Sequence, residues 1–279
     1  MQSWDLDRKI QVTTARIMEW YEHYNGLVYV AFSGGKDSTV LLDLVRRIYP
    51  DVPAVFCDTG LEFPEIRQFA MSVNNVVVLR PEMNFKKVIE TYGYPIVSKR
   101  VADTVEYGHK PGSFRWKELH GEIIRSNGTK SEFNCEKWCY LLDAPFKVSS
   151  RCCNIMKKKP MKKYSKETGR VPIIATMADE SRSRRSVWMS TGCNAFQKKS
   201  PSSQPMSFWT ENDVLEYIHT YNIPYASVYG DIVPCGGGGQ RQAKKEPGVC
   251  FALLALIWRS LQTVFSGSNC LIQSCGSIA

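Results

Sequence analysis

A continuous apolar run that passes directly into a glycine turn and then a helix most constrains the fold of this chain. Residues 27–32 read LVYVAF, which is typical of a strand buried on both faces. The turn SGGKDS follows at residues 33–38, and residues 37–48 carry apolar side chains at helical spacing. Strands are also predicted at 53–57 and 76–79, with a helix that opens at Pro64 between them. This alternation predicts an α/β fold with a Rossmann-like parallel sheet and right-handed crossovers.

The rest of the chain extends this plan. An amphipathic helix is expected at about 5–23, mostly helical structure at 95–150, and a further strand at 171–176. Thr210 and Asp213 form the capping-box pattern of a helix that ends before Pro224. We therefore expect one α/β domain over residues 1–234, with a helical insertion at about 95–170. Residues 235–279, which begin with Cys235 and four glycines, form an atypical C-terminal tail.

Positive charge is concentrated in one segment. The 279 residues include 36 Lys+Arg and 27 Asp+Glu, a net charge of +9. Residues 147–170 alone hold nine basic side chains and one acid, Glu167, and the basic ones are Lys147, Arg151, Lys157, Lys158, Lys159, Lys162, Lys163, Lys166 and Arg170. Such a run is either a solvated face or a site for phosphate, sulfate or a nucleic-acid backbone.

The turn at residues 33–38 has the chemistry of a phosphate site. Gly34 and Gly35 let consecutive backbone N–H groups point at one anion, and the helix N-terminus adds partial positive charge. Lys36 supplies a full charge, and Asp37 would cap the helix or hold a metal bound to the phosphates. Ser33 and Ser38 add hydroxyl donors. The spacing excludes a Walker A loop and a dinucleotide fingerprint.

Four motifs in order resemble a known family. SGGKDS resembles the PP-loop of the adenine nucleotide α-hydrolase superfamily, and DTG at residues 58–60 with FPE at 63–65 resembles its phosphoadenosine phosphosulfate (PAPS) reductase branch. ADES at 178–181, with the arginines that follow it, and PMSFWT at 205–210 resemble two later motifs of that branch. The resemblance covers residues 25–234.

The resemblance implies a set of site residues. The nucleotide would bind at Ser33, Gly34, Gly35, Lys36, Asp37, Ser38, Asp58, Thr59 and Gly60. Asp58 would orient Mg²⁺ or the ribose, and Arg182, Arg184 and Arg185 would clamp a sulfate or terminal phosphate. Lys36, Asp37, Arg182 and Arg185 would act in catalysis. For Trp209, core packing is the favoured interpretation over substrate contact.

Cysteines raise the question of a metal. Cys135 and Cys139 have helical spacing and Cys152 and Cys153 are adjacent, so the four make either one metal site or a set of buried thiols. Iron–sulfur members of the related reductases pair Cys-Cys with a later Cys-x-x-Cys, which this chain lacks. Thioredoxin-dependent reductases carry a C-terminal Glu-Cys-Gly-x-His nucleophile, whereas residues 274–277 here read SCGS.

These features leave several functions open. The first is an adenylyl-nucleotide enzyme, in which reduction of PAPS or adenylyl sulfate competes with ATP-dependent adenylation for sulfur transfer to tRNA or DNA. The others are a nucleic-acid-binding protein and a nucleotide-binding module without catalysis. We expect Mg²⁺ with the nucleotide, and a nucleic-acid or thioredoxin-type partner. We also expect a cytoplasmic protein without a membrane contact, because the longest apolar run, 249–258, is short and no signal-peptide core precedes the first helix.

Overall fold

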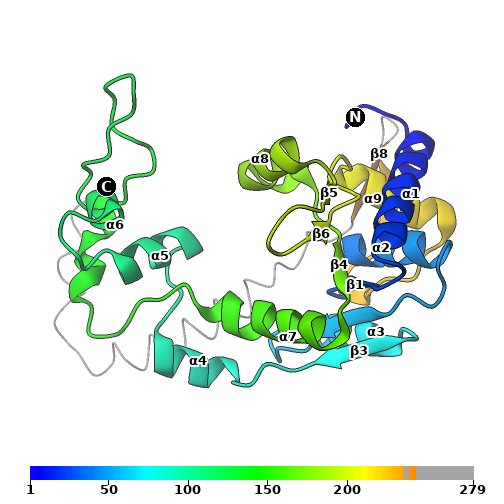
Figure 1. Ribbon diagram of the computed structural model, residues 1–279, viewed down its shortest axis with the longest axis horizontal. Coiled ribbons are helices and arrows are strands. Elements are labelled where there is room, and N and C mark those ends of the chain that lie inside the picture. The colour runs from blue at the N-terminus through cyan, green and yellow to red at the C-terminus, as the bar shows by residue number, and fades with distance from the viewer. Residues whose placement is uncertain (236–238, 243–279) are drawn as a thin grey trace. The chain divides into compact units, whose positions relative to one another are not determined.

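A computed structural model describes residues 1–235 and 239–242, which divide into two compact units (Figure 1). The first unit comprises residues 1–81 together with the described residues from Lys159 onward, and the second comprises Glu82–Lys158. The predicted tail from 235 lies almost wholly outside the described residues.

The first unit contains a six-stranded sheet and its covering helices. Its strands are β1 (Val28–Phe32), β2 (Ala54–Cys57), β3 (Val76–Leu79), β4 (Val171–Ile174), β5 (Asn194–Ala195) and β6 (Ser202–Ser203). Its α-helices are α1 (Leu6–His23), α2 (Lys36–Arg46), α3 (Pro64–Ser72), α7 (Lys159–Thr168), α8 (Arg182–Thr191) and α9 (Glu211–Tyr221). Short 3₁₀ turns η3 (Ala178–Glu180) and η4 (Ser227–Tyr229) and a hairpin of β7 (Ile232–Cys235) and β8 (Gly239–Gln242) complete it.

The sheet has the strand order β3-β2-β1-β4-β6-β5. All neighbours pair in parallel except β5 and β6, which are antiparallel. The chain leaves β1 toward β2 on one side and returns to β4 on the other, so the carboxyl end of β1 lies where the strand order reverses. Ligands of open α/β sheets bind in the crevice at such a switch point. The predicted α/β parallel sheet is confirmed.

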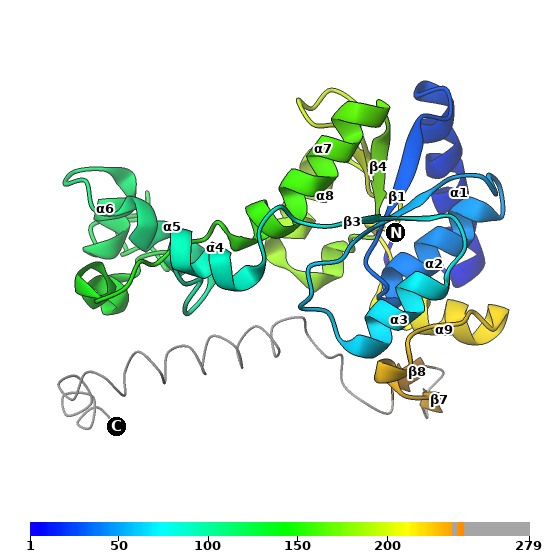
Figure 2. The ribbon, with the colours of Figure 1, turned by 90° about the horizontal axis from the view of Figure 1, so that it is seen from below.

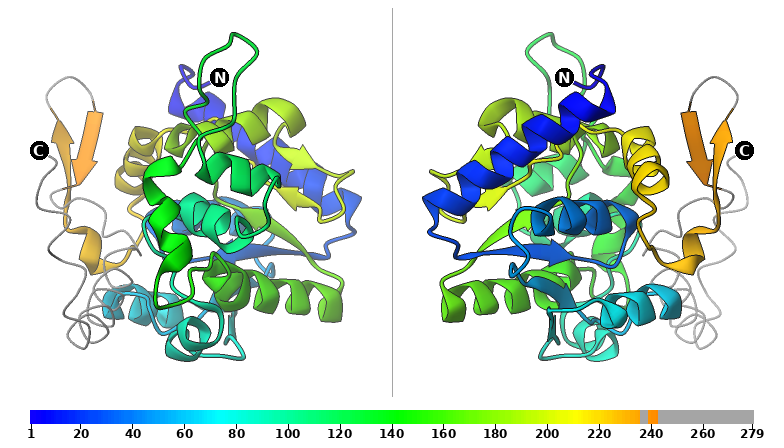
Figure 3. Two further views of the ribbon diagram at one scale, coloured as in Figure 1. Left: turned by 90° about the vertical axis from the view of Figure 1, so that its left-hand side faces the viewer. Right: turned by 90° about the vertical axis from the view of Figure 1, so that its right-hand side faces the viewer.

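Helices cover both faces of this sheet: Figure 3 shows α1 and α2 on one side of β1 and α7 on the other. The core between them consists of fully buried side chains such as Val30, Leu41 and Ile173. Burial of one such side chain contributes about 1.5–3 kcal/mol. Trp209, predicted to pack in the core, is 0% exposed, and its indole N–H donates to Thr13 Oγ1 of α1 over 2.8 Å.

A buried ion pair also joins α1 to α9. Lys9 Nζ of α1 lies 2.6–2.7 Å from both carboxylate oxygens of Asp213, and Lys9 is 1% exposed. The same carboxylate accepts hydrogen bonds from the backbone and hydroxyl of Thr210, the predicted capping box of α9. Asp213 therefore both caps α9 and neutralises the buried ammonium.

The second unit is made of short helices joined by loops (Figure 2). They are α4 (Phe85–Tyr92), α5 (Lys99–Tyr107), α6 (Phe114–Leu119), the 3₁₀ helix η1 (Glu136–Asp143) and the π-turn η2 (Asn154–Lys158). Its own small core includes Val101, Val105, Leu119 and Leu141. At its centre the carboxylate of Glu118, which is 2% exposed, accepts hydrogen bonds from Arg100 and Arg115, each over 2.6 Å.

Several predicted boundaries need correction. Helix α2 begins at Lys36, with Gly35 in the N-cap position, so Asp37 does not cap it. Strand β4 ends at Ile174, because a turn in which Thr176 N–H donates to Ile174 O follows at once. Among residues 1–235 and 239–242, no helix combines the length and the apolar character needed to cross a bilayer.

Candidate nucleotide-binding site

Hydrogen bonds of its own serine hydroxyls link the two ends of the predicted phosphate loop, residues 33–38. Ser38 Oγ donates to Gly35 O over 2.9 Å, and the Ser33 backbone N–H donates to Ser38 Oγ over 3.2 Å. The hydroxyls of Ser33 and Ser38 lie 3.0 Å apart. These contacts tie the end of β1 to the first turn of α2.

Glycine is required at position 34, and position 35 leaves little room for a side chain. Gly34 has a φ of +73°, and a Cβ there would lie 2.8 Å from Ile66 Cγ2 of α3. A Cβ at Gly35 would lie 3.1 Å from the Tyr229 hydroxyl oxygen. The sequence pointed to the glycines, but the two neighbours that close in on them come from distant segments and carried no recognisable signal.

Lys36 is buried at the N-terminus of α2. Its side chain is 3% exposed and pairs with Asp37 Oδ1 at 3.1 Å and Glu211 Oε1 at 3.6 Å. Beside it lies a cavity of about 170 Å³, and its lining residues are Lys36, Asp37, Met177, Asp179, Glu180 and Glu211. The structure thus brings the loop together with the predicted ADES motif and with Glu211, which sequence reasoning missed.

Asp58, at the carboxyl end of β2, faces two arginines. Arg67 of α3 donates to both Asp58 carboxylate oxygens over 3.0–3.2 Å, and Arg80 Nε lies 3.8 Å away. The hydrogen bonds from Arg67 are the main reason that the pKa of Asp58 is lowered from its usual 3.8. The next residue, Thr59, is held by Glu62, whose carboxylate accepts from its hydroxyl over 2.6 Å.

The three predicted sulfate-binding arginines lie in the first turn of α8. Ser181 caps this helix by accepting the Arg184 backbone N–H. All three arginine side chains are exposed, and Arg184 forms an ion pair with Glu180. Since Glu180 lines the cavity beside Lys36, Arg184 is linked to that cavity through this carboxylate.

The structure does not assemble the four predicted cysteines into one metal site. Cys135 Sγ donates to Phe133 O, Cys139 Sγ lies 3.8 Å from His120 Nε2, and the Sγ atoms of Cys152 and Cys153 lie 3.9 Å apart. In the described part of the chain, no group of three or more His, Cys, Asp or Glu side chains could hold a metal ion. A cluster held by these four thiols does not fit such separate contacts.

The adjacent cysteines Cys152 and Cys153 differ in the pKa of their thiols and in their exposure. The hydrogen bond from Cys152 is the main cause that lowers the pKa of Cys153 to about 6, and the positive charges of Lys99, Lys157 and Lys158 act in the same direction. The pKa of Cys152 is raised, because it is the hydrogen-bond donor of the pair. Cys153 is exposed, whereas Cys152 is buried. The pair thus joins an exposed thiol of lowered pKa to a buried thiol of raised pKa.

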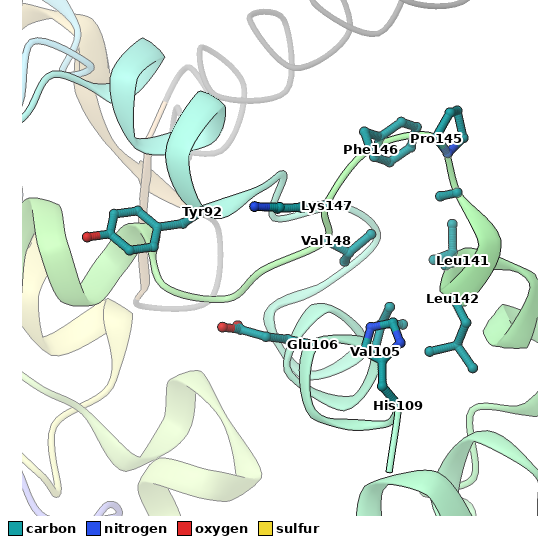
Figure 4. Close-up of a pocket in the computed structure, with 11 residues that line it drawn as sticks. Tyr92, Val105, Glu106, His109, Leu141, Leu142, Pro145, Phe146, Lys147 and Val148 are labelled. Atoms are coloured by element: carbon teal, nitrogen blue, oxygen red, sulfur yellow. The ribbon is translucent and has the colours of Figure 1, made fainter. Parts of the chain in front are cut away.

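The second unit has a larger cavity of its own, of about 530 Å³ (Figure 4). Leu141, Leu142 and Phe146 line one part of it, and Val105 and His109 another. Glu106 also lines it, but its carboxylate accepts hydrogen bonds from Ser149, Ser150 and Arg151. None of these residues belongs to the motifs recognised in the sequence.

The structure is that of an α/β protein whose glycine loop lies between β1 and α2, at the switch point of the parallel sheet. The family model of the phosphoadenosine phosphosulfate reductase domain matches residues 27–105 and 125–235 of this chain. The chain belongs to this family, as the motifs predicted.

Curated relatives are distant. An adenosine 5′-phosphosulfate reductase of Geobacillus kaustophilus (strain HTA426) is 26% identical over 212 residues, which cover 75% of this chain and 70% of the relative. Adenosine 5′-phosphosulfate reductase 2 of Bacillus subtilis (strain 168) is 24% identical over 230 residues, which cover 79% of this chain and 75% of the relative. An uncharacterized protein of Methanocaldococcus jannaschii is 32% identical over 105 residues, and the chain spans only 25% of its length.

Two solved structures are similar at 14% identity. A phosphoadenylyl-sulfate (PAPS) reductase from Candida auris in a phosphate complex gives a TM-score of 0.44, with 84% of this chain and 95% of that chain covered. A U34-tRNA thiolase from Methanococcus maripaludis with its [4Fe-4S] cluster gives a TM-score of 0.37, and the match covers 94% of this chain and 76% of the thiolase chain.

Proposed function

We propose that residues 33–38 bind the phosphate of an adenylyl nucleotide and that the chain is an enzyme acting on PAPS or adenylyl sulfate. The observation that carries the proposal is the closed glycine loop at the end of β1, with Lys36 buried in the first turn of α2. Helix N-termini with free N–H groups favour anions, and a buried ammonium strengthens that preference.

The loop residues would divide the work between them. Backbone N–H groups of Gly34 and Gly35 and the ammonium of Lys36 would stabilise charge on the leaving group. Asp37 and Glu211 both lie against Lys36, and carboxylates are suitable ligands for Mg²⁺, which binds with one or two of them plus phosphate oxygens. When bound, Mg²⁺ would neutralise phosphate charge.

Two reactions fit this site. In the reductive one, Arg182, Arg184 and Arg185 hold the sulfate while a thiolate attacks its sulfur, and a thioredoxin-type partner restores the thiol. In the adenylating one, ATP loses pyrophosphate and an acceptor is activated for sulfur transfer. The names of the Geobacillus and Bacillus relatives favour the first. A site that binds nucleotide without turnover is the third outcome.

A nucleic-acid partner is a second candidate, favoured by the basic helix α7. This helix buries none of its side chains, and its four lysines, Lys159, Lys162, Lys163 and Lys166, are exposed. Polyanion binding through these lysines would weaken steeply with added salt.

The decisive experiment is product analysis with PAPS, adenylyl sulfate or ATP, in the presence of Mg²⁺ and a dithiol. We expect sulfite from PAPS or adenylyl sulfate, and pyrophosphate with AMP from ATP would instead support the adenylating reaction. Lys36→Ala should lower turnover by at least about 100-fold, because loss of one charge-stabilising donor costs that much. Lys162→Ala, an exposed lysine of α7, is the matched control and should keep full turnover.

Two results would contradict the proposal. Equal nucleotide affinity and turnover in Lys36→Ala and Lys162→Ala would reject the assignment of the loop. Nucleotide binding to the loop without any product would leave the loop assignment standing but reject an enzyme.

A further inference from the structure

A cysteine and a histidine meet in the second unit, outside every motif that the family resemblance uses. Cys139 lies in η1 and His120 directly follows α6, and Cys139 Sγ is 3.8 Å from His120 Nε2. This distance lies within hydrogen-bonding range for sulfur. Cys139 is half-buried and His120 is exposed, so a reagent in solvent can reach the pair.

The orientation of the histidine ring is fixed from its other side. His120 Nδ1 lies 2.8 Å from the backbone oxygen of Trp116. A carbonyl oxygen can only accept, so Nδ1 carries the hydrogen, and in the neutral ring Nε2 keeps its lone pair toward Cys139. The ring also stacks on the indole of Trp116, with centroids 3.8 Å apart and planes 20° apart.

The backbone around the pair is anchored as well. Cys135 N–H donates to Glu118 O over 2.8 Å, which ties the start of η1 to the end of α6. Trp138 N–H then donates to Cys135 O over 2.8 Å and sets the first turn of η1. The Glu118 side chain is held in turn by Arg100 and Arg115. The contacts between α6 and η1 thus hold the Cys139 thiol, the His120 ring and the Trp116 backbone oxygen in place.

We propose that Cys139 is a nucleophilic thiol with His120 as its general base, and that the pair attacks the S–S bond of a disulfide or persulfide. A nucleophile next to a base that a third group orients is the arrangement of activated nucleophiles in general. This site is independent of the proposed nucleotide chemistry, and nucleotide turnover plays no part in its test.

The step needs no external oxidant. As Cys139 Sγ attacks, its proton passes to His120 Nε2, and a new S–S bond forms between Cys139 and one sulfur of the substrate. The old S–S bond breaks, its electron pair leaves on the second sulfur, and that thiolate takes the proton from His120. The leaving sulfur falls from oxidation number −1 to −2 and Cys139 Sγ rises from −2 to −1, so the exchange balances without a net gain or loss of electrons, as in thiol–disulfide exchange generally.

Two other cysteines of the same unit provide internal comparisons. Cys135 is 7% exposed, and burial raises the pKa of its thiol, so it is expected to react slowly. Cys153 is exposed and activated by Cys152 and by nearby lysines, without a histidine. Cys153 should therefore react with disulfides as well, but its rate should not depend on His120.

The test follows adduct formation on each cysteine of the full chain by peptide mass spectrometry. With oxidised glutathione we expect a glutathionyl adduct on Cys139, and with glutathione persulfide we expect one added sulfur atom there, which distinguishes the two substrate sources. His120→Gln should slow the reaction at Cys139 at least about tenfold, which is less than the usual general-base effect of about 100-fold or more because a thiol is a good nucleophile even without a base. The rate at Cys153 should stay unchanged, and Cys139→Ser should lose only the Cys139 adduct.

Three outcomes would overturn the proposal. One is an equal rate at Cys139 with and without His120, and another is a fall at Cys139 and Cys153 together, which would indicate a general structural change. The third is the absence of any adduct on Cys139 in the folded protein when urea-unfolded chain forms one. Trp116→Leu, which removes the stacked ring but leaves the backbone carbonyl, should slow Cys139 less than His120→Gln does.

Discussion

The first unit buries the carboxylate of Asp213 and the second that of Glu118, and the partners of these two carboxylates differ in their exposure to solvent. In the first unit, Asp213 pairs with Lys9, and both side chains are less than a tenth exposed. In the second, Glu118 is 2% exposed, but the side chains of its partners Arg100 and Arg115 are 37% and 34% exposed. A cation that keeps contact with water loses little when its anion is removed, whereas a sealed one is left uncompensated. Removal of the buried carboxylate is therefore expected to lower the free energy of unfolding more for Asp213 than for Glu118.

The largest effect is expected for Asp213→Ala. The change leaves the Lys9 ammonium buried without its counter-ion and removes the half of the capping box in which Asp213 accepts from Thr210, so we expect a loss of about 4 kcal/mol in the free energy of unfolding. Urea denaturation of the full chain measures it. The double variant Lys9→Met, Asp213→Leu should recover most of the loss, since an apolar pair of similar volume often replaces a buried ion pair without cost. A double variant as unstable as Asp213→Ala would show that most of the loss comes from the missing capping-box contact with Thr210 and not from the uncompensated charge of Lys9.

A smaller and local loss is expected for Glu118→Ala. Its two arginines can turn to water, so we expect about 2 kcal/mol, mainly from the lost charge-assisted hydrogen bonds and the space left in the small core. Hydrogen exchange should rise within residues 82–158 and stay unchanged in the strands β1, β2 and β4. Glu122→Ala, an exposed glutamate of the same unit, is the control and should change neither. Faster exchange throughout the sheet would break the contrast between the units.

The contrast also separates what the sequence could predict from what it could not. Strand β3 and the capping box of α9 agree with their predictions, because an apolar run and a Thr-x-x-Asp pattern are local signals. Strands β5 and β6 were missed, since each has two residues and β6 is Ser-Ser, a pattern that only pairing with β4 makes a strand.

The site follows the same division. The glycine turn at residues 33–38, between β1 and α2, could be predicted because its residues are contiguous in sequence, whereas its role in binding phosphate stays a prediction. Glu211 beside Lys36, Tyr229 against Gly35 and Lys9 beneath Asp213 were not found, since each contact joins segments more than 170 residues apart. The pairing of Cys139 with His120 was likewise hidden: the spacing of Cys135 and Cys139 suggested a common ligand set, and the 3₁₀ winding of η1 and the fold of α6 decide their partners instead.

The smallest effect is expected in the first unit, where the buried carboxylate of Asp58 meets the exposed side chain of Arg67. Arg67 lowers the pKa of Asp58, so ionised Asp58 stabilises the folded state. This contribution is fully present well above the usual pKa of 3.8 and is lost as the pH falls below it toward the folded-state pKa. The side chain of Arg67 is 46% exposed, so solvent screening keeps the contribution under about 1 kcal/mol. Asp58→Asn should therefore be slightly less stable than the parent at neutral pH.

Urea denaturation of both proteins from neutral pH down to the acid range tests this, with the exposed Asp51→Asn as the control. The difference between parent and Asp58→Asn should shrink below the usual aspartate pKa and vanish at the lowest pH, whereas the Asp51→Asn curve should run close to that of the parent throughout. A difference in the free energy of unfolding that persists at low pH would mean that the substitution disturbs the packing at the end of β2 and does not act through the charge of Asp58. A difference well above 1 kcal/mol at neutral pH would mean that Asp58 and Arg67 are as sealed from water as Lys9 and Asp213, and the distinction between sealed and solvent-reaching pairs would then fail within a single unit.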